Sequence, residues 1–171
     1  MSKAEDMIKE DSKYFATSGR IKYYPLVIDH GYGATLVDID GKEYIDLLAS
    51  ASSQNVGHAP KQVTEAIKKQ VDKFIHYTPA YMYHEPLVKL SKKLCDISPG
   101  DYEKRVTYGL SGSDANDGII KFARAYTGRP YIISFTNAYH GSTFGSLSMS
   151  AISLNMRKKY GPLLNGFYHI P

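Results

Sequence analysis

Residues 107–128 read TYGLSGSDANDGIIKFARAYTG, a turn of small polar side chains between a short apolar run and an amphipathic segment. Apolar residues recur at helical spacing from Asp114 to Tyr126, which predicts a helix there. Short apolar runs predict a strand on either side of it, at Arg105–Gly109 and at Tyr131–Phe135. A strand, a helix and a strand within about 30 residues predict a βαβ unit with parallel strands, and therefore an α/β fold.

The predicted topology places two turns at one edge of the sheet. Parallel strands end on the same side, so the turns Leu110–Ser113 and Thr136–Thr143 should open together. Open α/β sheets bind their ligands at that edge. We therefore expect the functional site where these two turns meet.

The first turn has the composition of an anion site. Ser111, Gly112 and Ser113 stand at the start of the predicted helix, where backbone N–H groups lack partners and the helix dipole is positive. The alternative is purely structural, with Ser113 or Asp114 capping the helix and Asp117 completing a capping box. Neither a G-x-x-x-x-G-K-[ST] nor a G-x-G-x-x-G motif follows the strand, which argues against P-loop and dinucleotide sites.

The second turn, within TNAYHGSTFGS at residues 136–146, offers an aromatic face and an imidazole. Tyr139 can stack on a planar ligand, and His140 can donate a hydrogen bond to it or orient it. An anion-binding turn beside the ring of Tyr139 suits a flat phosphorylated cofactor.

The remaining elements are predicted from periodicity and turn chemistry. We interpret Ala4–Thr17 as a short helix, and Asp40-Gly41 within Gly33–Ser50 predicts a β-hairpin. Amphipathic helices should follow Pro60 and Pro86, and Ser98-Pro99-Gly100 should end the second of them.

Composition narrows the functional classes. The 171 residues suffice for about one domain, and the net charge of +4 is spread without runs of like charge, which argues against a nucleic-acid partner. No apolar run reaches about 18 residues and no signal peptide is evident, so we expect a cytoplasmic protein without a membrane partner. Cys95 is the single cysteine, and the histidines lack ligand spacing with carboxylates, so no metal site is expected.

Four motifs in order carry a resemblance to a known family: DIDGKEYID at 38–46, NVGH at 55–58, SGSDAND at 111–117 and YHG at 139–141. The chain resembles the class III pyridoxal-phosphate-dependent aminotransferases over nearly its whole length. Within them it is most similar to bacterial 4-aminobutyrate aminotransferase and to isoleucine 2-epimerase. The resemblance implies the N-terminal portion of a fold-type I transferase, the aspartate aminotransferase-like fold.

The resemblance also implies domains and site residues. Residues 1–58 would be the N-terminal segment of the small domain, and residues 59–171 the first part of the large pyridoxal-phosphate-binding α/β domain. Pyridoxal 5'-phosphate would be bound by residues of the two turns, namely Ser111, Gly112, Ser113, Tyr139 and His140. Leu47–Gln54 would approach the substrate. The Schiff-base lysine and the aspartate at the ring nitrogen would lie beyond residue 171, so no catalytic residue is assigned within the chain.

For the whole protein, the resemblance implies a homodimer that transfers an amino group from an amino acid, 4-aminobutyrate-like or related, to a 2-oxo acid. A racemase or epimerase of the isoleucine 2-epimerase type is the close alternative. A non-catalytic phosphate-binding module is the alternative from another class, and a fragment without a ligand is the simplest one.

Overall fold

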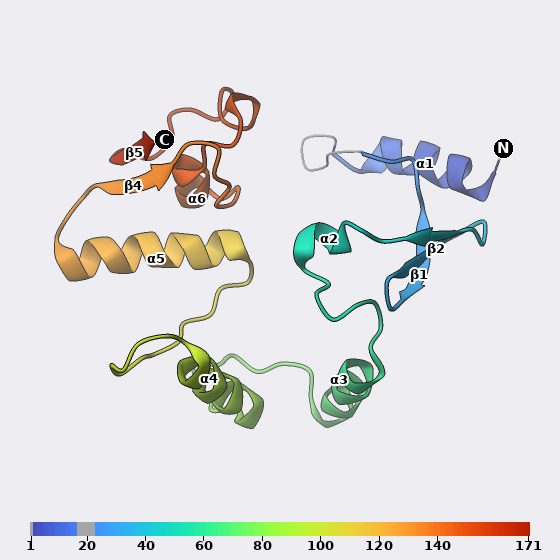
Figure 1. Cartoon of the computed structure of the whole chain (residues 1–171), viewed down its shortest axis with the longest axis horizontal. Coiled ribbons are helices and arrows are strands. Elements are labelled where there is room, and N and C mark those ends of the chain that lie inside the picture. The colour runs from blue at the N-terminus through green and yellow to red at the C-terminus, as the bar shows by residue number, and fades with distance from the viewer. Residues whose placement is uncertain (1, 17–22) are drawn as a thin grey trace. The chain divides into compact units, whose positions relative to one another are not determined.

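The structure is a computed structural model that describes residues 2–16 and 23–171. The chain divides into two compact units, Met1–Tyr81 and Met82–Pro171, coloured blue to green and green to red in Figure 1. The assignment of residues 1–58 and 59–171 to a small and a large domain stays a prediction. Among the helices in the described ranges, none combines the length and the apolarity needed to cross a membrane.

The first unit opens with α1 (Lys3–Tyr14), whose start is a capping box. The Oγ of Ser2 accepts the N–H of Glu5 at 3.2 Å, and the Glu5 carboxylate accepts the N–H of Ser2 at 2.9 Å. This reciprocal pair satisfies two backbone donors at the helix start. Phe15 is extended and ends the helix, so the predicted helix is confirmed from Ala4 to Tyr14, and its predicted end at Thr17 lies outside the described residues.

An antiparallel sheet of order β1-β2-β3 follows, built from β1 (Ile28–Tyr32), β2 (Thr35–Asp38) and β3 (Glu43–Ile45). The strands β2 and β3 are the predicted hairpin, and Gly41 in their turn has a φ of 88° that glycine adopts readily. The Oδ1 atom of Asp38 closes this turn by accepting the N–H groups of Asp40 and Lys42 at 3.1 and 2.8 Å. The sequence pattern did not predict β1, because its residues, IDHGY, show neither an apolar run nor a regular alternation of apolar and polar residues.

Two helices complete the first unit. The short α2 (Ala49–Ser52) is a turn of left-handed backbone, with φ values of 47, 50, 53 and 67° along its four residues. The longer α3 (Lys61–Lys73) begins after Pro60, as predicted, and ends where Phe74 becomes extended. Apolar side chains on α3 are exposed, among them Val63, Ile67 and Val71.

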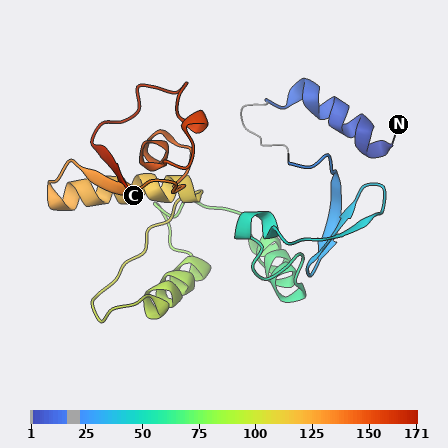
Figure 2. The ribbon, with the colours of Figure 1, turned by 45° about the horizontal axis from the view of Figure 1, so that its top comes forward.

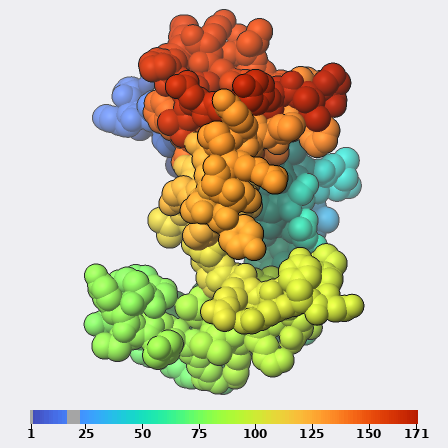
Figure 3. Space-filling view, turned by 90° about the vertical axis from the view of Figure 1, so that its left-hand side faces the viewer, coloured from blue at the N-terminus to red at the C-terminus, as the bar shows by residue number. Residues whose placement is uncertain are grey.

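The second unit contains α4 (Glu85–Ile97), α5 (Gly112–Thr127), β4 (Ile132–Phe135), α6 (Phe144–Met149), the 3-10 turn η2 (Leu154–Met156) and β5 (Phe167–Ile170). Both predicted helices are confirmed. The first ends where Ser98 becomes extended, and the second ends at Gly128, which takes the left-handed conformation at a φ of 67°. Figure 3 shows residues 130–171, orange to red, as one continuous body.

The parallel pair β4 and β5 packs on α6 (Figure 2). Residues 145–149 of α6 are all buried, and the carbonyl oxygen of Met149 joins the helix to both strands. It accepts hydrogen bonds from the Ser134 hydroxyl at 2.8 Å and from Nε2 of His169 at 3.1 Å. Within β4, Ser134 is buried while its neighbours Ile133 and Phe135 are exposed, so α6 covers one face of this pair.

One predicted element is wrong. Residues 105–109 form no strand, and within the described part of the chain β4 pairs with β5 instead. A strand needs backbone hydrogen bonds to a neighbouring strand, whereas this segment and the preceding Lys104 contact side chains of α4. The Tyr108 hydroxyl lies 2.9 Å from Oγ of Ser91, and the Cys95 thiol donates to the Lys104 carbonyl at 3.4 Å.

Candidate functional site

The site predicted from the two turns lies at the N-terminus of α5. Ser111 is the N-cap: its backbone is extended, and its hydroxyl oxygen accepts the N–H of Asp114 at 3.2 Å. The Asp114 carboxylate reaches back and accepts the N–H of Leu110 at 2.9 Å. The alternative in which Ser113 or Asp114 caps the helix is therefore wrong, because the helix begins at Gly112, one residue before the first of these candidates.

The first turn of α5 leaves backbone donors available. Within residues 2–16 and 23–171, no hydrogen bond from the N–H of Gly112 or Ser113 is found, as expected for the first helical positions. A Cβ added at Gly112 would meet nothing within 4 Å, so the space in front of this turn is open. The positive end of the helix dipole and two N–H donors without partners therefore lie beside the open space at Gly112, an arrangement that can admit an anion.

The second predicted turn is docked onto this helix start. The N–H of Ser142 donates to the Ser113 hydroxyl oxygen at 3.1 Å, and the Thr143 hydroxyl donates to the Ser113 carbonyl at 3.4 Å. One turn further along α5, Nδ2 of Asn116 donates to the His140 carbonyl at 2.6 Å. The structure thus brings the two turns together as the sequence predicted, although the strand expected to precede the first turn is absent from the described residues.

Gly141 makes this docking possible. Its φ is 128°, and a Cβ there would collide with the Oγ of Ser113 and lie 2.8 Å from the Ser113 Cα atom and 2.5 Å from the Oγ of Ser146. Real Cβ atoms do not approach backbone so closely, so only glycine lets the second turn reach the helix start.

A buried layer of hydroxyl groups supports the second turn from α6. Ser146 and Ser150 are 0% and 1% exposed. The Ser150 hydroxyl accepts the N–H of His140 at 2.9 Å and lies 3.1 Å from the Gly141 carbonyl. The N–H of Ser146 donates to Oδ1 of Asp117 at 2.7 Å, so the carboxylate expected in a capping box instead joins α5 to α6.

Sequence reasoning missed the roles of Asn116, Asp117 and Ser150. Helical spacing could have indicated Asn116 and Asp117, because they follow Ser113 by three and four residues and so share its face of the helix. Ser150 lies after the short α6, where no sequence periodicity marked it.

The two aromatic candidates of the second turn differ in exposure. The Tyr139 side chain is 55% exposed, and its hydroxyl lies 3.2 Å from Oγ of Ser142. Nε2 of His140 is buried, and no partner for it is found in the described part of the chain. A buried imidazole nitrogen without a partner is costly, so its site suits a ligand group that can hydrogen-bond to it.

The first unit holds a second polar cluster, which pairs a histidine with a carboxylate. Nε2 of His58 lies 2.7 Å from Oδ2 of Asp46, with side chains that are 18% and 7% exposed. The other carboxylate oxygen accepts the N–H groups of Leu48 and Ala49 at 3.0 and 2.8 Å. The hydrogen bond with His58 and then the Ala49 N–H hold the pKa of Asp46 below its ordinary value.

The cluster lies at the start of the left-handed turn α2. Left-handed backbone costs about 1–2 kcal/mol per residue that carries a Cβ, and Ala49, Ser50, Ala51 and Ser52 all adopt it. Such backbone persists only where surrounding interactions determine it, and it is concentrated at functional sites.

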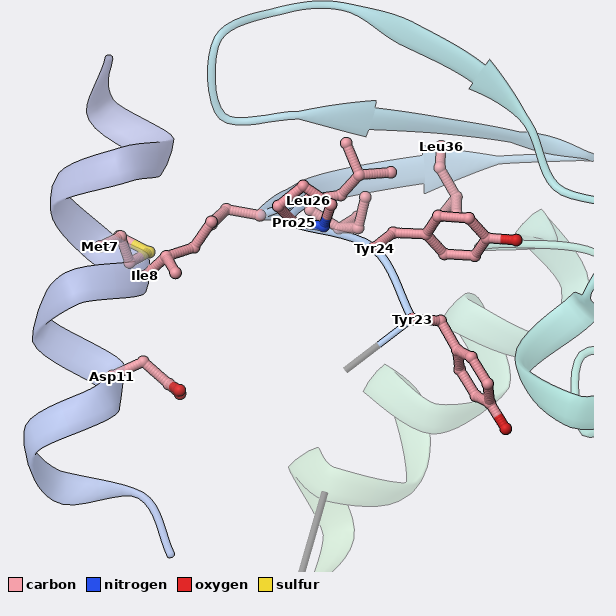
Figure 4. A pocket seen from close by; sticks show the side chains of 10 residues that line it. Met7, Ile8, Asp11, Tyr23, Tyr24, Pro25, Leu26 and Leu36 are labelled. Atoms are coloured by element: carbon pink, nitrogen blue, oxygen red, sulfur yellow. The ribbon is translucent and has the colours of Figure 1, made fainter. Parts of the chain in front are cut away.

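A cavity of about 620 Å³ also lies in the first unit (Figure 4). Its lining is mostly apolar and contains none of the predicted site residues: Met7, Ile8, Asp11, Tyr23, Tyr24, Pro25, Leu26, Val27, Ile28 and Leu36. No group of three metal-ligating side chains is found in the described ranges. The convergent polar groups therefore point to the α5 start as the candidate site.

Comparison with known proteins identifies the family of this chain. Residues 16–171 match the model of the family described as aminotransferase class-III. The chain belongs to this family. It spans 38% of the length of isoleucine 2-epimerase from Lentilactobacillus buchneri and is 59% identical to it over 171 residues, the whole of this chain.

Two further relatives represent the amino-transferring members of the family. A probable 4-aminobutyrate aminotransferase of Bacillus subtilis is 36% identical over 141 residues, which cover 82% of this chain and 32% of that protein. The crystal structure of taurine:2-oxoglutarate aminotransferase from Bifidobacterium kashiwanohense, in complex with PLP and glutamate, matches with a TM-score of 0.87 and 32% identity. That match covers 99% of this chain and 38% of the other, and it confirms the fold-type I architecture.

Proposed function

We propose that the full-length protein is a pyridoxal-phosphate-dependent aminotransferase that moves an amino group from an amino acid, 4-aminobutyrate-like or related, to a 2-oxo acid. The observation that carries the proposal is the α5 start, where free N–H donors and the exposed Tyr139 ring converge in a class III aminotransferase. Family membership favours an enzyme over a non-catalytic phosphate-binding module.

The first turn of α5 fits the phosphate group. The N–H groups of Gly112 and Ser113 would donate to its oxygens, and the open space at Gly112 leaves room for them. The hydroxyl oxygens of Ser111 and Ser113 already accept backbone N–H groups, so each hydroxyl proton remains available for an anion. The start of α5 therefore offers hydrogen-bond donors to the phosphate oxygens.

The second turn fits the ring. Tyr139 would stack on the pyridine face, and His140 would place its buried Nε2 beside the ring edge. When bound, pyridoxal phosphate supplies an electron sink for the carbon that loses its proton. The residues of this chain hold and orient that group, while Leu47–Gln54, with its small side chains, would lie on the substrate side. A homodimer in the cytoplasm is part of the same proposal.

Racemisation or epimerisation is the second candidate, and a specific observation favours it. The relative with 59% identity over the whole chain is an isoleucine 2-epimerase. Both reactions remove a proton from the carbon that bears the amino group, but only amino transfer requires a 2-oxo acid.

The cofactor assignment is tested by Tyr139→Ala in the full-length protein. Loss of stacking should weaken pyridoxal phosphate binding about tenfold, measured by absorbance titration of the apoprotein. Tyr126→Ala, which removes a tyrosine that is 94% exposed on α5, is the matched control and should leave binding unchanged. Equal affinity of the two variants would argue against stacking by Tyr139.

The two candidate reactions are separated by omitting the acceptor. An aminotransferase should turn over 4-aminobutyrate or isoleucine only when 2-oxoglutarate or another 2-oxo acid is present. Chiral chromatography would detect inversion at the α-carbon. If inversion occurs without any 2-oxo acid, the protein is a racemase or epimerase instead.

A further inference from the structure

The motifs at 38–46 and 55–58 end in two residues, Asp46 and His58, that meet in space although eleven residues separate them. The intervening segment, Leu47–Gly57, contains the left-handed turn α2 and is exposed except at Ala49 and Gly57. Few packing contacts are therefore available to hold an unfavourable backbone.

The segment is held at its two ends. At the first end, Asp46 donates its N–H to the Ala34 carbonyl at 2.8 Å, and its Oδ1 atom accepts the N–H groups of Leu48 and Ala49. These two bonds direct the chain into the turn immediately after β3. The Asp46 side chain is 7% exposed, so its hydrogen bonds are largely shielded from water.

At the second end, His58 is attached to the sheet. Its N–H donates to the Gly33 carbonyl at 2.8 Å, and its carbonyl accepts the Gly33 N–H at 3.1 Å. The imidazole packs against Gly31 of β1, where a Cβ would lie 3.0 Å from Cγ of the ring. The ring is thus held on the strand β1, and its Nε2 reaches Asp46.

We propose that Asp46 and His58 are positioning residues that together hold Leu47–Gly57 in its left-handed turn for substrate binding. The substrate part rests on the proposed function, in which Leu47–Gln54 lies on the substrate side. The hydrogen bond between the two side chains orients the carboxylate so that its other oxygen receives both backbone N–H groups.

The test uses the full-length protein and two substitutions of His58. His58→Phe keeps an aromatic ring on Gly31 but removes the bond to Asp46, whereas His58→Gln retains an N–H donor near the position of Nε2. The matched control is His30→Phe, because His30 forms a bond to Asp29 at 2.8 Å in which both side chains are about 60% exposed.

The first measurement is amide hydrogen exchange of the apoprotein. The N–H groups of Leu48 and Ala49 should exchange about tenfold faster in His58→Phe, while exchange in β2 and α3 stays unchanged. His58→Gln should restore most of the protection, and His30→Phe should have no effect on these amides. Unchanged exchange in His58→Phe, or no recovery in His58→Gln, overturns the proposal.

The second measurement separates this proposal from the function on which it rests. In the holoenzyme, His58→Phe should raise KM for the amino acid several-fold with kcat and pyridoxal phosphate affinity retained. An equal fall of kcat and cofactor affinity would mean general damage and would count against a positioning role. If the unsubstituted protein binds no pyridoxal phosphate, the proposed function fails, and the exchange data still decide whether the two residues hold the turn.

Discussion

The turn at 136–143 and the segment at 47–57 both follow a strand and both carry motif residues, yet they are held in opposite ways. The turn lies against α5 and rests on buried serines of α6 and the residue after it, with hydrogen bonds along its length. The segment is mostly exposed, and its side-chain anchor is a single carboxylate bonded to one histidine. Close fit secures the first, whereas one charged hydrogen-bonded group secures the second.

This difference predicts different sensitivities. A loop held by close fit should fail when atoms are added, because its neighbours, the Ser113 Cα atom and the Ser113 and Ser146 hydroxyl groups, already fill the space around it. A loop held by a carboxylate should tolerate added bulk elsewhere and fail when the charge is removed. Substitutions that add an atom, remove a hydrogen-bond acceptor or remove a charge should therefore affect the two loops differently.

The largest effect is expected from Gly141→Ala. The added Cβ would collide with Ser113 and require an unfavourable φ, so the docked turn should lose about 3 kcal/mol of local stability. Amide exchange at Ser142 and Ser146 should accelerate accordingly, while exchange at Leu48 and Ala49 stays as it is.

Gly118→Ala is the matched control for that substitution. A Cβ there makes only an ordinary contact with Phe122 at 3.8 Å, and alanine is the better helix former, so α5 should gain about 0.5–1 kcal/mol. Unaltered exchange in Gly141→Ala would show that the turn is not held by close fit.

A smaller effect is expected from Asp117→Ala. This substitution leaves the N–H of Ser146 without its acceptor in a buried site, which should cost about 2 kcal/mol of local stability in α6. Asp117→Asn keeps an amide oxygen as acceptor and should retain most of that stability. Exchange at Ser146 measures both, and equal acceleration in the two variants would contradict the assigned role of the hydrogen bond.

Much of the fold could be predicted from the sequence where one local signal dominates. The apolar spacing in α3, α4 and α5 and the Asp-Gly turn of the β2 and β3 hairpin are such signals, and all four elements are confirmed. The strand expected at 105–109 failed because an apolar run cannot tell a strand from an extended segment that lies along a helix. β1 was missed because its residues are mostly exposed and polar.

The meeting of the two turns was predicted, although the strand expected to place the first of them is absent from the described residues and hydrogen bonds between the turns hold them together. Its details depended on contacts between distant residues, such as Asp117 with Ser146, which no local pattern reports. The pairing of Asp46 with His58 was missed for the same reason. The run of small residues ASAS at 49–52 likewise gives no sign that its backbone is left-handed.

The smallest effect is the response of the segment to acid. The pKa of Asp46 is lowered in the folded state, so the stability it contributes is fully present above the unfolded value of about 3.9. As the pH falls below that value, the unfolded carboxyl takes up its proton first, and the contribution is lost progressively down to the folded pKa. Protection of the Leu48 and Ala49 amides, corrected for intrinsic exchange, should therefore decline by a few-fold below about pH 4.

Substitution of that carboxylate sharpens this last point. Asp46→Asn should remove the acid dependence at Leu48 and Ala49, whereas Asp29→Asn, at the exposed carboxylate beside His30, should leave it in place. The Ser142 amide of the docked turn, which donates to a serine hydroxyl that does not titrate, should keep its protection over the same pH interval. If the Ser142 amide loses protection over the same pH interval as the Leu48 amide, the two loops respond to acid together. The proposed difference between a loop held by close fit and a loop held by a carboxylate would then be wrong.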